Sequence, residues 1–175
     1  MKFDDFQIGY SGSYTTQMTA EKNQKFGELT GDFNPIHFDE ERMKKTIFGK
    51  CAINGLFTET AIGAALVKMF TSDETLIIAL KQENKLLNPV FIGDTITATV
   101  KVAERYPEKQ RLLCNCLTKN QDGKIVIDSK FLIKILNAWF YFLRTIREEI
   151  RFLVIFQDHF LLNSEESIEY IWEFH

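Results

Sequence analysis

Apolar and polar positions in the first thirty residues follow two different patterns. Residues 12–19, GSYTTQMT, are rich in Tyr and Thr and predict a strand. Thr19 then begins a helical pattern that places Phe26 and Leu29 on one face, and Gly31 acts as the stop signal for this helix. The N-terminal part of the chain therefore predicts one strand followed by one helix.

Further along, one long apolar segment precedes four segments with strand character. Asp39 is placed to cap a short helix, and residues 55–70, GLFTETAIGAALVKMF, predict a mostly apolar helix whose small residues allow close packing. Four strands are predicted after it, with a hairpin turn at Gln121-Asp122-Gly123-Lys124, and they cover residues 75–87, 94–106, 110–119 and 124–136. A buried helix followed by four antiparallel strands predicts an α+β fold in which a sheet wraps around the helix.

Residues 137–175 have a different composition, with ten aromatic residues and neither Gly nor Pro. Helical spacing of apolar side chains begins at Trp139, and Asn163 with Glu166 resembles a capping box, so the segment predicts a helical hairpin. Two interpretations stay open. The segment is an appendage that packs on the core or on a second subunit, or it does not belong to the natural domain.

Bulk composition narrows the class of protein. The chain has 175 residues, 45% hydrophobic and 26% charged, which is typical of one globular domain with its own core. A net charge of −3 does not indicate a nucleic-acid-binding protein, and neither an export signal nor a membrane-spanning run is visible in the sequence. The cysteines suit a reducing compartment and lack partners at metal-ligand spacing; they are Cys51, Cys114 and Cys116. We expect a cytoplasmic protein without a metal site.

An acid and an imidazole flank a turn in the stretch LTGDFNPIH, residues 29–37. His37 is the one histidine in the first 158 residues, so it is the candidate there for acid–base chemistry near neutral pH. A turn built by Gly31, Asn34 and Pro35 would bring the Asp32 carboxylate and the His37 ring to face one water molecule. The alternative is structural: Asp32 or Asn34 caps the turn, and His37 is a hydrogen-bonded buried ring.

A second candidate lies at the start of the apolar helix, in AINGLFTE, residues 52–59. Asn54 is a favoured N-cap residue, and Gly55 would begin the helix with a backbone N–H that another molecule can approach closely. Such an N–H stabilises a carbonyl oxygen that gains negative charge. The alternative is a plain helix cap.

Three segments, taken in order, resemble one family. FGELTGDFNPIHFD, AINGLF and NPVFIGDTITATV resemble the MaoC-like (R)-specific enoyl-CoA hydratases and 3-hydroxyacyl dehydratases of the hotdog fold, over residues 5–136. The Gly-Asp-x-Asn-Pro-x-His element is the specific part of this likeness. The resemblance implies a curved antiparallel sheet around a long helix, and a homodimer or dimer of dimers. It also implies reversible syn hydration of trans-2-enoyl-CoA to (R)-3-hydroxyacyl-CoA in fatty acid metabolism, without a metal or redox cofactor.

The resemblance also implies roles for individual residues. Asp32 and His37 match the catalytic pair that holds and activates water, and Gly55 matches the position whose N–H polarises the thioester carbonyl. Asn34 matches the turn residue that orders the pair. Thr60 falls where the family often has a serine that hydrogen-bonds the catalytic Asp.

One position departs from the family pattern, and several functions stay open. The family usually has His immediately before the helix glycine, where this chain has Asn54, which keeps the cap but loses a titratable group. An acyl-carrier-protein ester is the nearest alternative to a CoA ester as substrate. A non-catalytic acyl-CoA-binding hotdog module and an acyl-CoA thioesterase are further alternatives.

Overall fold

The computed structural model describes residues 1–137; the predictions for Trp139, Asn163 and Glu166 lie outside these described residues. The helices and strands follow in chain order: η1 (Phe3–Asp5), β1 (Ser11–Gln17), α1 (Ala20–Thr30), α2 (Pro35–Phe38), α3 (Glu40–Met43), α4 (Gly55–Phe70), β2 (Thr75–Leu86), β3 (Thr95–Tyr106), η2 (Pro107–Lys109), β4 (Arg111–Asn120) and β5 (Ile125–Asn137).

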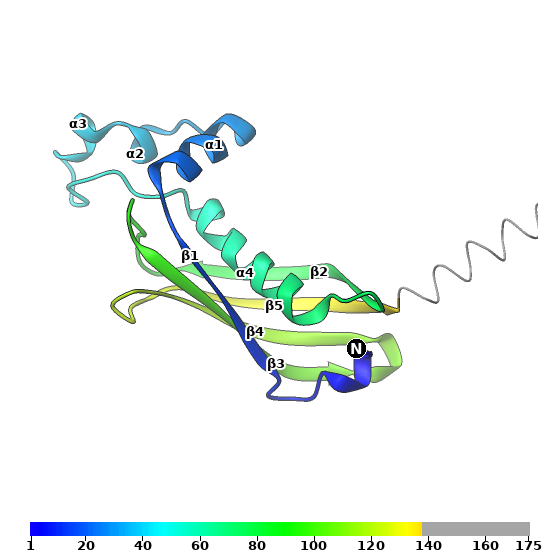
Figure 1. Cartoon of the computed structure of the whole chain (residues 1–175). Helices are drawn as coiled ribbons and strands as arrows, with labels where there is room; N and C mark the ends of the chain where they lie inside the picture. The colour runs from blue at the N-terminus through cyan, green and yellow to red at the C-terminus, as the bar shows by residue number, and fades with distance from the viewer. Residues whose placement is uncertain (138–175) are drawn as a thin grey trace, which may run out of the picture. The chain divides into compact units, whose positions relative to one another are not determined.

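One antiparallel sheet carries the fold, with the strand order β1-β3-β4-β5-β2. Helix α4 lies across one face of this sheet (Figure 1). Alternate residues of β4 are buried beneath it, and on α4 itself Ile62, Ala65 and Leu66 are at most 3% exposed. This alternation is what a strand with one covered face requires. The predicted α+β fold, with a sheet wrapped around a long helix, is confirmed.

Most predicted elements match the structure closely. The helix predicted at 55–70 is α4 itself, and each of the four later strands agrees with its prediction to within about a residue at either end. Thr19 accepts a hydrogen bond from the Lys22 N–H at the start of α1, and Gly31 ends α1 with a left-handed φ of 76°. These two terminal signals are local, so the sequence is sufficient to place them.

Two predictions about the N-terminal helices were wrong in detail. Leu29 was predicted to share a buried face with Phe26, but 85% of it is exposed, because the covered face of α1 is the one with Asn23 and Gly27. The chain after Asn34 was predicted as a turn, but it forms the one-turn helix α2, with Asn34 as N-cap and Pro35 as its first residue. Pro is favoured there because its fixed φ suits a first helical residue.

Helices α1, α2 and α3 gather at the end of the sheet where α4 begins (Figure 1). There the segment that precedes α4 runs beside α2, since the Ala52 N–H donates to the Ile36 carbonyl oxygen at 3.1 Å. On its other side, the Ile53 N–H donates to the Val90 carbonyl oxygen at 2.7 Å. Residues 52–54 are therefore held between α2 and the segment that connects β2 to β3.

Strand β2 is an edge of the sheet, hydrogen-bonded along one side to β5. Leu76, Ile78 and Leu80 on this strand are 43–50% exposed. A long edge strand with apolar side chains can pair with another strand. Among residues 1–137, the helices are too short or too polar to cross a lipid bilayer.

Candidate active site

The Asp32 carboxylate is fixed through both of its oxygen atoms. Oδ1 accepts a hydrogen bond from the Asn34 backbone N–H at 3.2 Å, and Oδ2 accepts one from the Asn54 side-chain amide at 2.5 Å. Asp32 is half-buried, so it is oriented by the protein and still reachable. The structural interpretation of Asp32 as a turn residue thus accounts for one oxygen, while the second oxygen connects Asp32 to the start of α4.

The His37 ring is oriented by a backbone carbonyl group. Its Nδ1 lies 2.8 Å from the Ala52 carbonyl oxygen. Because a carbonyl oxygen only accepts hydrogen bonds, Nδ1 carries the proton, and the neutral ring then has Nε2 as its lone-pair nitrogen. His37 is half-buried, and no partner of Nε2 lies within hydrogen-bonding distance among residues 1–137. This nitrogen is suited to take a proton from a bound molecule and to return it.

Two buried asparagines connect the two candidate catalytic residues. Asn54 is 3% exposed; besides donating to Asp32, its Oδ1 caps α4 by accepting from the Leu56 N–H at 2.9 Å. Asn23 is 2% exposed; its Oδ1 accepts from the Asn54 N–H at 3.4 Å, and its amide donates to the His37 carbonyl oxygen at 3.2 Å. The start of α4, Asp32 and His37 therefore belong to one hydrogen-bonded unit.

Asn23 was not among the site residues predicted from the sequence. One signal was available: Asn23 and Gly27 lie one turn apart on the same face of α1, and the buried face of a helix normally carries apolar side chains. A buried amide must find partners for its donors and its acceptor, and Asn23 finds them on segments that are distant in sequence.

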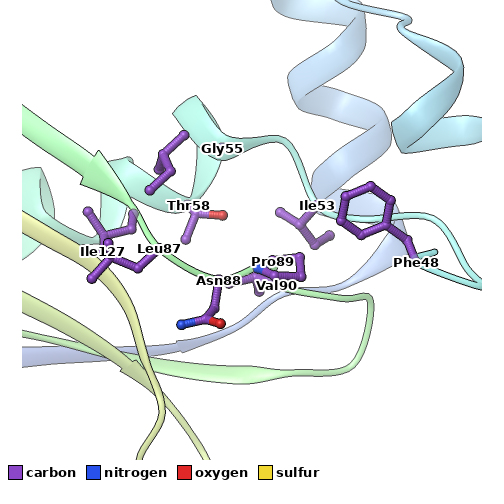
Figure 2. Close-up of a pocket in the computed structure, with 10 residues that line it drawn as sticks. Phe48, Ile53, Gly55, Thr58, Leu87, Asn88, Pro89, Val90 and Ile127 are labelled. Carbon is purple, nitrogen blue, oxygen red and sulfur yellow. The ribbon is translucent and has the colours of Figure 1, made fainter.

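Gly55 is the first residue of α4 and lines a cavity of about 210 Å³. Its backbone N–H has no acceptor within the described part of the chain. A Cβ at this position would lie 2.9 Å from Leu86 Cδ1, so a glycine keeps the approach to the N–H open. Figure 2 shows the cavity, which is mostly apolar and is lined by Phe48, Ile53, Gly55, Thr58, Leu86, Leu87, Asn88, Pro89, Val90 and Ile127.

The remaining predicted site residues occupy different places. Asn34 is exposed, and its side-chain oxygen caps α2 by accepting from the Ile36 N–H at 3.3 Å. The Thr60 hydroxyl donates to the Phe57 carbonyl oxygen at 2.6 Å. A hydroxyl has one proton to donate, so Thr60 does not supply the hydrogen bond to Asp32; Asn54 supplies it instead.

The cysteines are unreactive in character, both the two on β4 and Cys51, which directly precedes Ala52. Burial raises the pKa of both Cys114 and Cys116 to about 12. The pKa of Cys51 is raised to about 11, mainly by burial and secondly by the negative charge of the nearby Glu40. All three are free thiols. In residues 1–137, no group of three or more His, Cys, Asp or Glu side chains is arranged to hold a metal ion. The chemistry available at the site is therefore that of a carboxylate, an imidazole and a backbone N–H.

Comparison with known proteins identifies the family. The family model of the MaoC-like domain matches residues 7–117, a range that contains Asp32, His37 and Gly55. The chain belongs to the MaoC-like family. A 3-hydroxybutyryl-CoA dehydratase from Methylorubrum extorquens is 32% identical over 135 residues, which cover 76% of this chain and 83% of the relative.

Two further proteins support the same family and fold. An (R)-specific enoyl-CoA hydratase from Rhodospirillum rubrum is 29% identical over 133 residues, or 76% of this MaoC-like chain and 90% of the relative. The solved structure of the R-hydratase PhaJ1 from Pseudomonas aeruginosa superposes with a TM-score of 0.68 at 28% identity, over 77% of this chain and 87% of that one. The MaoC-like protein has the hotdog fold.

Proposed function

We propose that this MaoC-like protein catalyses the reversible hydration of trans-2-enoyl-CoA to (R)-3-hydroxyacyl-CoA. The protein is an enzyme of the hydratase and dehydratase class, like the relatives named for these two directions of one reaction. The observation that carries the proposal is the hydrogen-bonded unit in which Asn23 and Asn54 connect Asp32, His37 and the start of α4.

Water addition needs a base for the water molecule and an acid for the α-carbon. In our proposal, Asp32 and His37 hold the water between them, and one of the two removes its proton as the oxygen attacks the β-carbon. A proton is delivered to the α-carbon on the same face, so the addition is syn and the pair ends with its original protonation. The half-buried carboxylate and the lone-pair Nε2 of His37 support this assignment.

The same reaction needs a place for negative charge on the thioester oxygen. Gly55 provides it in our proposal, because its N–H has no acceptor within residues 1–137 and stands at the positive end of a 16-residue helix. The mostly apolar cavity beside Gly55 would receive the acyl group. The chain's own residues suffice for each step, so neither a metal nor a redox cofactor is part of the proposal.

The first test is the loss of the conjugated enoyl-thioester absorbance when the full chain is added to crotonyl-CoA. We expect decay to the (R)-product, and a loss of roughly two to four orders of magnitude in kcat/KM for both Asp32→Asn and His37→Ala in folded protein. Lys119→Ala, at an exposed position near the C-terminal end of β4, is a surface control that should retain wild-type activity.

The alternatives predict different results in the same assay. Acyl-CoA binding without absorbance decay, for crotonyl-CoA and for longer enoyl-CoA esters, would leave a non-catalytic binding module. Release of free thiol from a saturated acyl-CoA would indicate a thioesterase. Faster decay with crotonyl esters of acyl carrier protein than with crotonyl-CoA would make that protein the natural carrier.

We further propose that the protein works as a homodimer, or as a dimer of dimers, in the cytoplasm. The open edge of β2 with its exposed Leu76, Ile78 and Leu80 supports a strand-to-strand interface. In this proposal residues 1–136 form the MaoC-like domain, and residues 137–175 are a C-terminal extension of unassigned role. Sedimentation of the full chain should give at least twice the 20.4 kDa mass of one chain.

A further inference from the structure

The Leu86 side chain lies directly against the glycine that begins α4. Outside its own segment, the three atoms nearest to a Cβ placed on Gly55 all belong to Leu86: Cδ1 at 2.9 Å, Cδ2 at 3.8 Å and Cγ at 3.9 Å. Carbon atoms in contact are normally about 3.5–4.0 Å apart, so a carbon atom on this side of Gly55 already overlaps the end of the leucine. Leu86 therefore limits the space beside the Gly55 backbone.

The backbone direction points the Gly55 N–H toward the cavity. Successive N–H groups of an extended backbone point to alternate sides, and Asn54 is extended, with a ψ of 132°. The Ala52 and Asn54 N–H groups donate toward α2 and α1, whereas the Ile53 N–H donates to the Val90 carbonyl oxygen. By this alternation the Gly55 N–H points to the Val90 side, where the cavity lies.

A thioester bound by the Gly55 N–H brings its acyl carbons close to Leu86. The backbone nitrogen and a Cβ share one Cα and are about 2.5 Å apart. An oxygen that accepts from this N–H lies about 2.9 Å from the nitrogen, so it is near the Leu86 methyl groups as well. Of the two groups bonded to the thioester carbon, the sulfur leads to CoA, and the α-carbon leads into the cavity that Leu86 lines. The α-carbon is therefore the one that faces the leucine.

The Leu86 backbone is fixed, while its side chain is largely uncovered. Leu86 is the last residue of β2 and pairs with Ile127 on β5, which is 1% exposed. Leu86 itself is 58% exposed. Strand pairing thus holds the point from which the branched end projects. A fixed apolar side chain with an uncovered end can distinguish bound molecules by their shape.

We propose that Leu86 is a specificity-determining residue, which leaves room for a hydrogen atom but not for a methyl group on the α-carbon of the substrate. This inference rests on the proposed function and adds to it a selection among enoyl-CoA esters by one side chain. The selection acts where the acyl group meets the Gly55 N–H, so it is independent of the length of the acyl chain.

The test compares two isomeric esters in the full chain, trans-2-pentenoyl-CoA and tiglyl-CoA, which differ in whether one methyl group ends the chain or sits on the α-carbon. We expect the ratio of the two kcat/KM values to favour the pentenoyl ester in the wild-type protein. Leu86→Ala should lower this ratio by at least about tenfold, because one carbon in a tight apolar site is worth roughly 10–200-fold. The intrinsic reactivity of each ester is the same for every variant, so a change in the ratio reports the site.

Two further variants make the comparison specific, with circular dichroism as the check on folding. Leu86→Val removes a single carbon and keeps a residue that favours strands, so it should lower the ratio by less than Leu86→Ala and still fold. Leu87→Ala is the matched control, because Leu87 lines the same cavity and is 51% exposed, whereas the atoms nearest to the Gly55 Cβ position belong to Leu86. Its ratio should stay at the wild-type value.

Crotonyl-CoA separates failure of this inference from failure of the proposed function. Hydration of crotonyl-CoA, together with an unchanged ratio in both folded Leu86 variants or a wild-type preference for tiglyl-CoA, would overturn the role of Leu86 and leave the hydratase intact. A fall in the ratio for Leu87→Ala as large as that for Leu86→Ala would overturn it as well, because the effect would then be general to the cavity. The absence of hydration with all three esters would overturn both.

Discussion

Replacing Asn54 by alanine removes two different contacts at once, and their separate costs can be worked from the structure. The Asn54 side chain caps α4 through the Leu56 N–H and donates to Asp32. Loss of an N-cap costs about 1 kcal/mol. Loss of a buried hydrogen bond to a charged group costs about 1.5–3 kcal/mol. We therefore expect Asn54→Ala to lower the free energy of unfolding by about 2.5–4 kcal/mol.

Two matched variants separate the contribution of the helix cap from that of the hydrogen bond to Asp32. Asn54→Ser keeps an oxygen that can cap α4 and loses the amide that holds Asp32, so about 1.5–3 kcal/mol should be lost. Thr19→Ala removes the equivalent cap of α1, where the Thr19 hydroxyl accepts from the Lys22 N–H and has no contact with Asp32. This variant should lose about 1 kcal/mol and keep its activity.

Urea unfolding followed by circular dichroism gives the stabilities, and hydration of crotonyl-CoA gives the activities. A carboxylate displaced by about 1 Å can cost roughly 100-fold in rate, so both Asn54 variants should show such a loss while remaining folded at low urea. The reasoning is refuted if Asn54→Ala loses no more stability than Thr19→Ala, or if Asn54→Ser retains wild-type kcat/KM.

Three further predictions concern the cavity and its surroundings. Gly55→Ala should lower kcat/KM for crotonyl-CoA by roughly tenfold or more, because the new Cβ obstructs the approach to the backbone N–H. The melting temperature should change little, since that Cβ displaces only the flexible end of Leu86. Unchanged kinetics would contradict the reasoning that a glycine is needed to keep this approach open. Burial raises the pKa of Glu59, so the folded state binds its proton more tightly than the unfolded state, and this contribution to stability is lost as pH rises through the raised pKa. The melting temperature of Glu59→Gln relative to wild type should therefore increase from pH 4 to pH 7, and a flat difference would contradict the shift. Burial raises the pKa of Cys114 and Cys116 to about 12, so neither thiol should react with a disulfide reagent at pH 8 until the protein is unfolded. The absorbance of the thiolate released from the reagent measures this reaction.

The sequence predicted the elements well because their ends depend on local chemistry. Thr19, Gly31 and Asn54 act within one helical turn of their own positions, so their roles as helix signals are visible without the fold. The alternation of buried residues in β4 and β5 is likewise local.

The contacts that build the candidate site were less accessible from the sequence. Asn54 contacts Asp32 across 22 positions, and Asn23 contacts Asn54 across 31. Such partners depend on how α1 and residues 52–54 approach each other in space, which periodicity does not encode. Leu29 shows the same limit: its spacing suited a buried face, but the direction from which α1 is covered decided its exposure. Thr60 differs from these cases, because its hydroxyl bonds to the Phe57 carbonyl oxygen three residues earlier in the same helix.

The double use of Asn54 has a consequence for how this protein can evolve. Its oxygen supports the helix that would polarise the carbonyl, while its nitrogen restrains the carboxylate that would act on water. A substitution that removes both atoms alters the electrophilic and the nucleophilic halves of the reaction together, and only a residue that keeps the capping oxygen, such as Ser, changes the carboxylate side alone. Adaptation to a new acyl group is more accessible on β2 and β5, where side chains beside the cavity can vary without disturbing that shared amide.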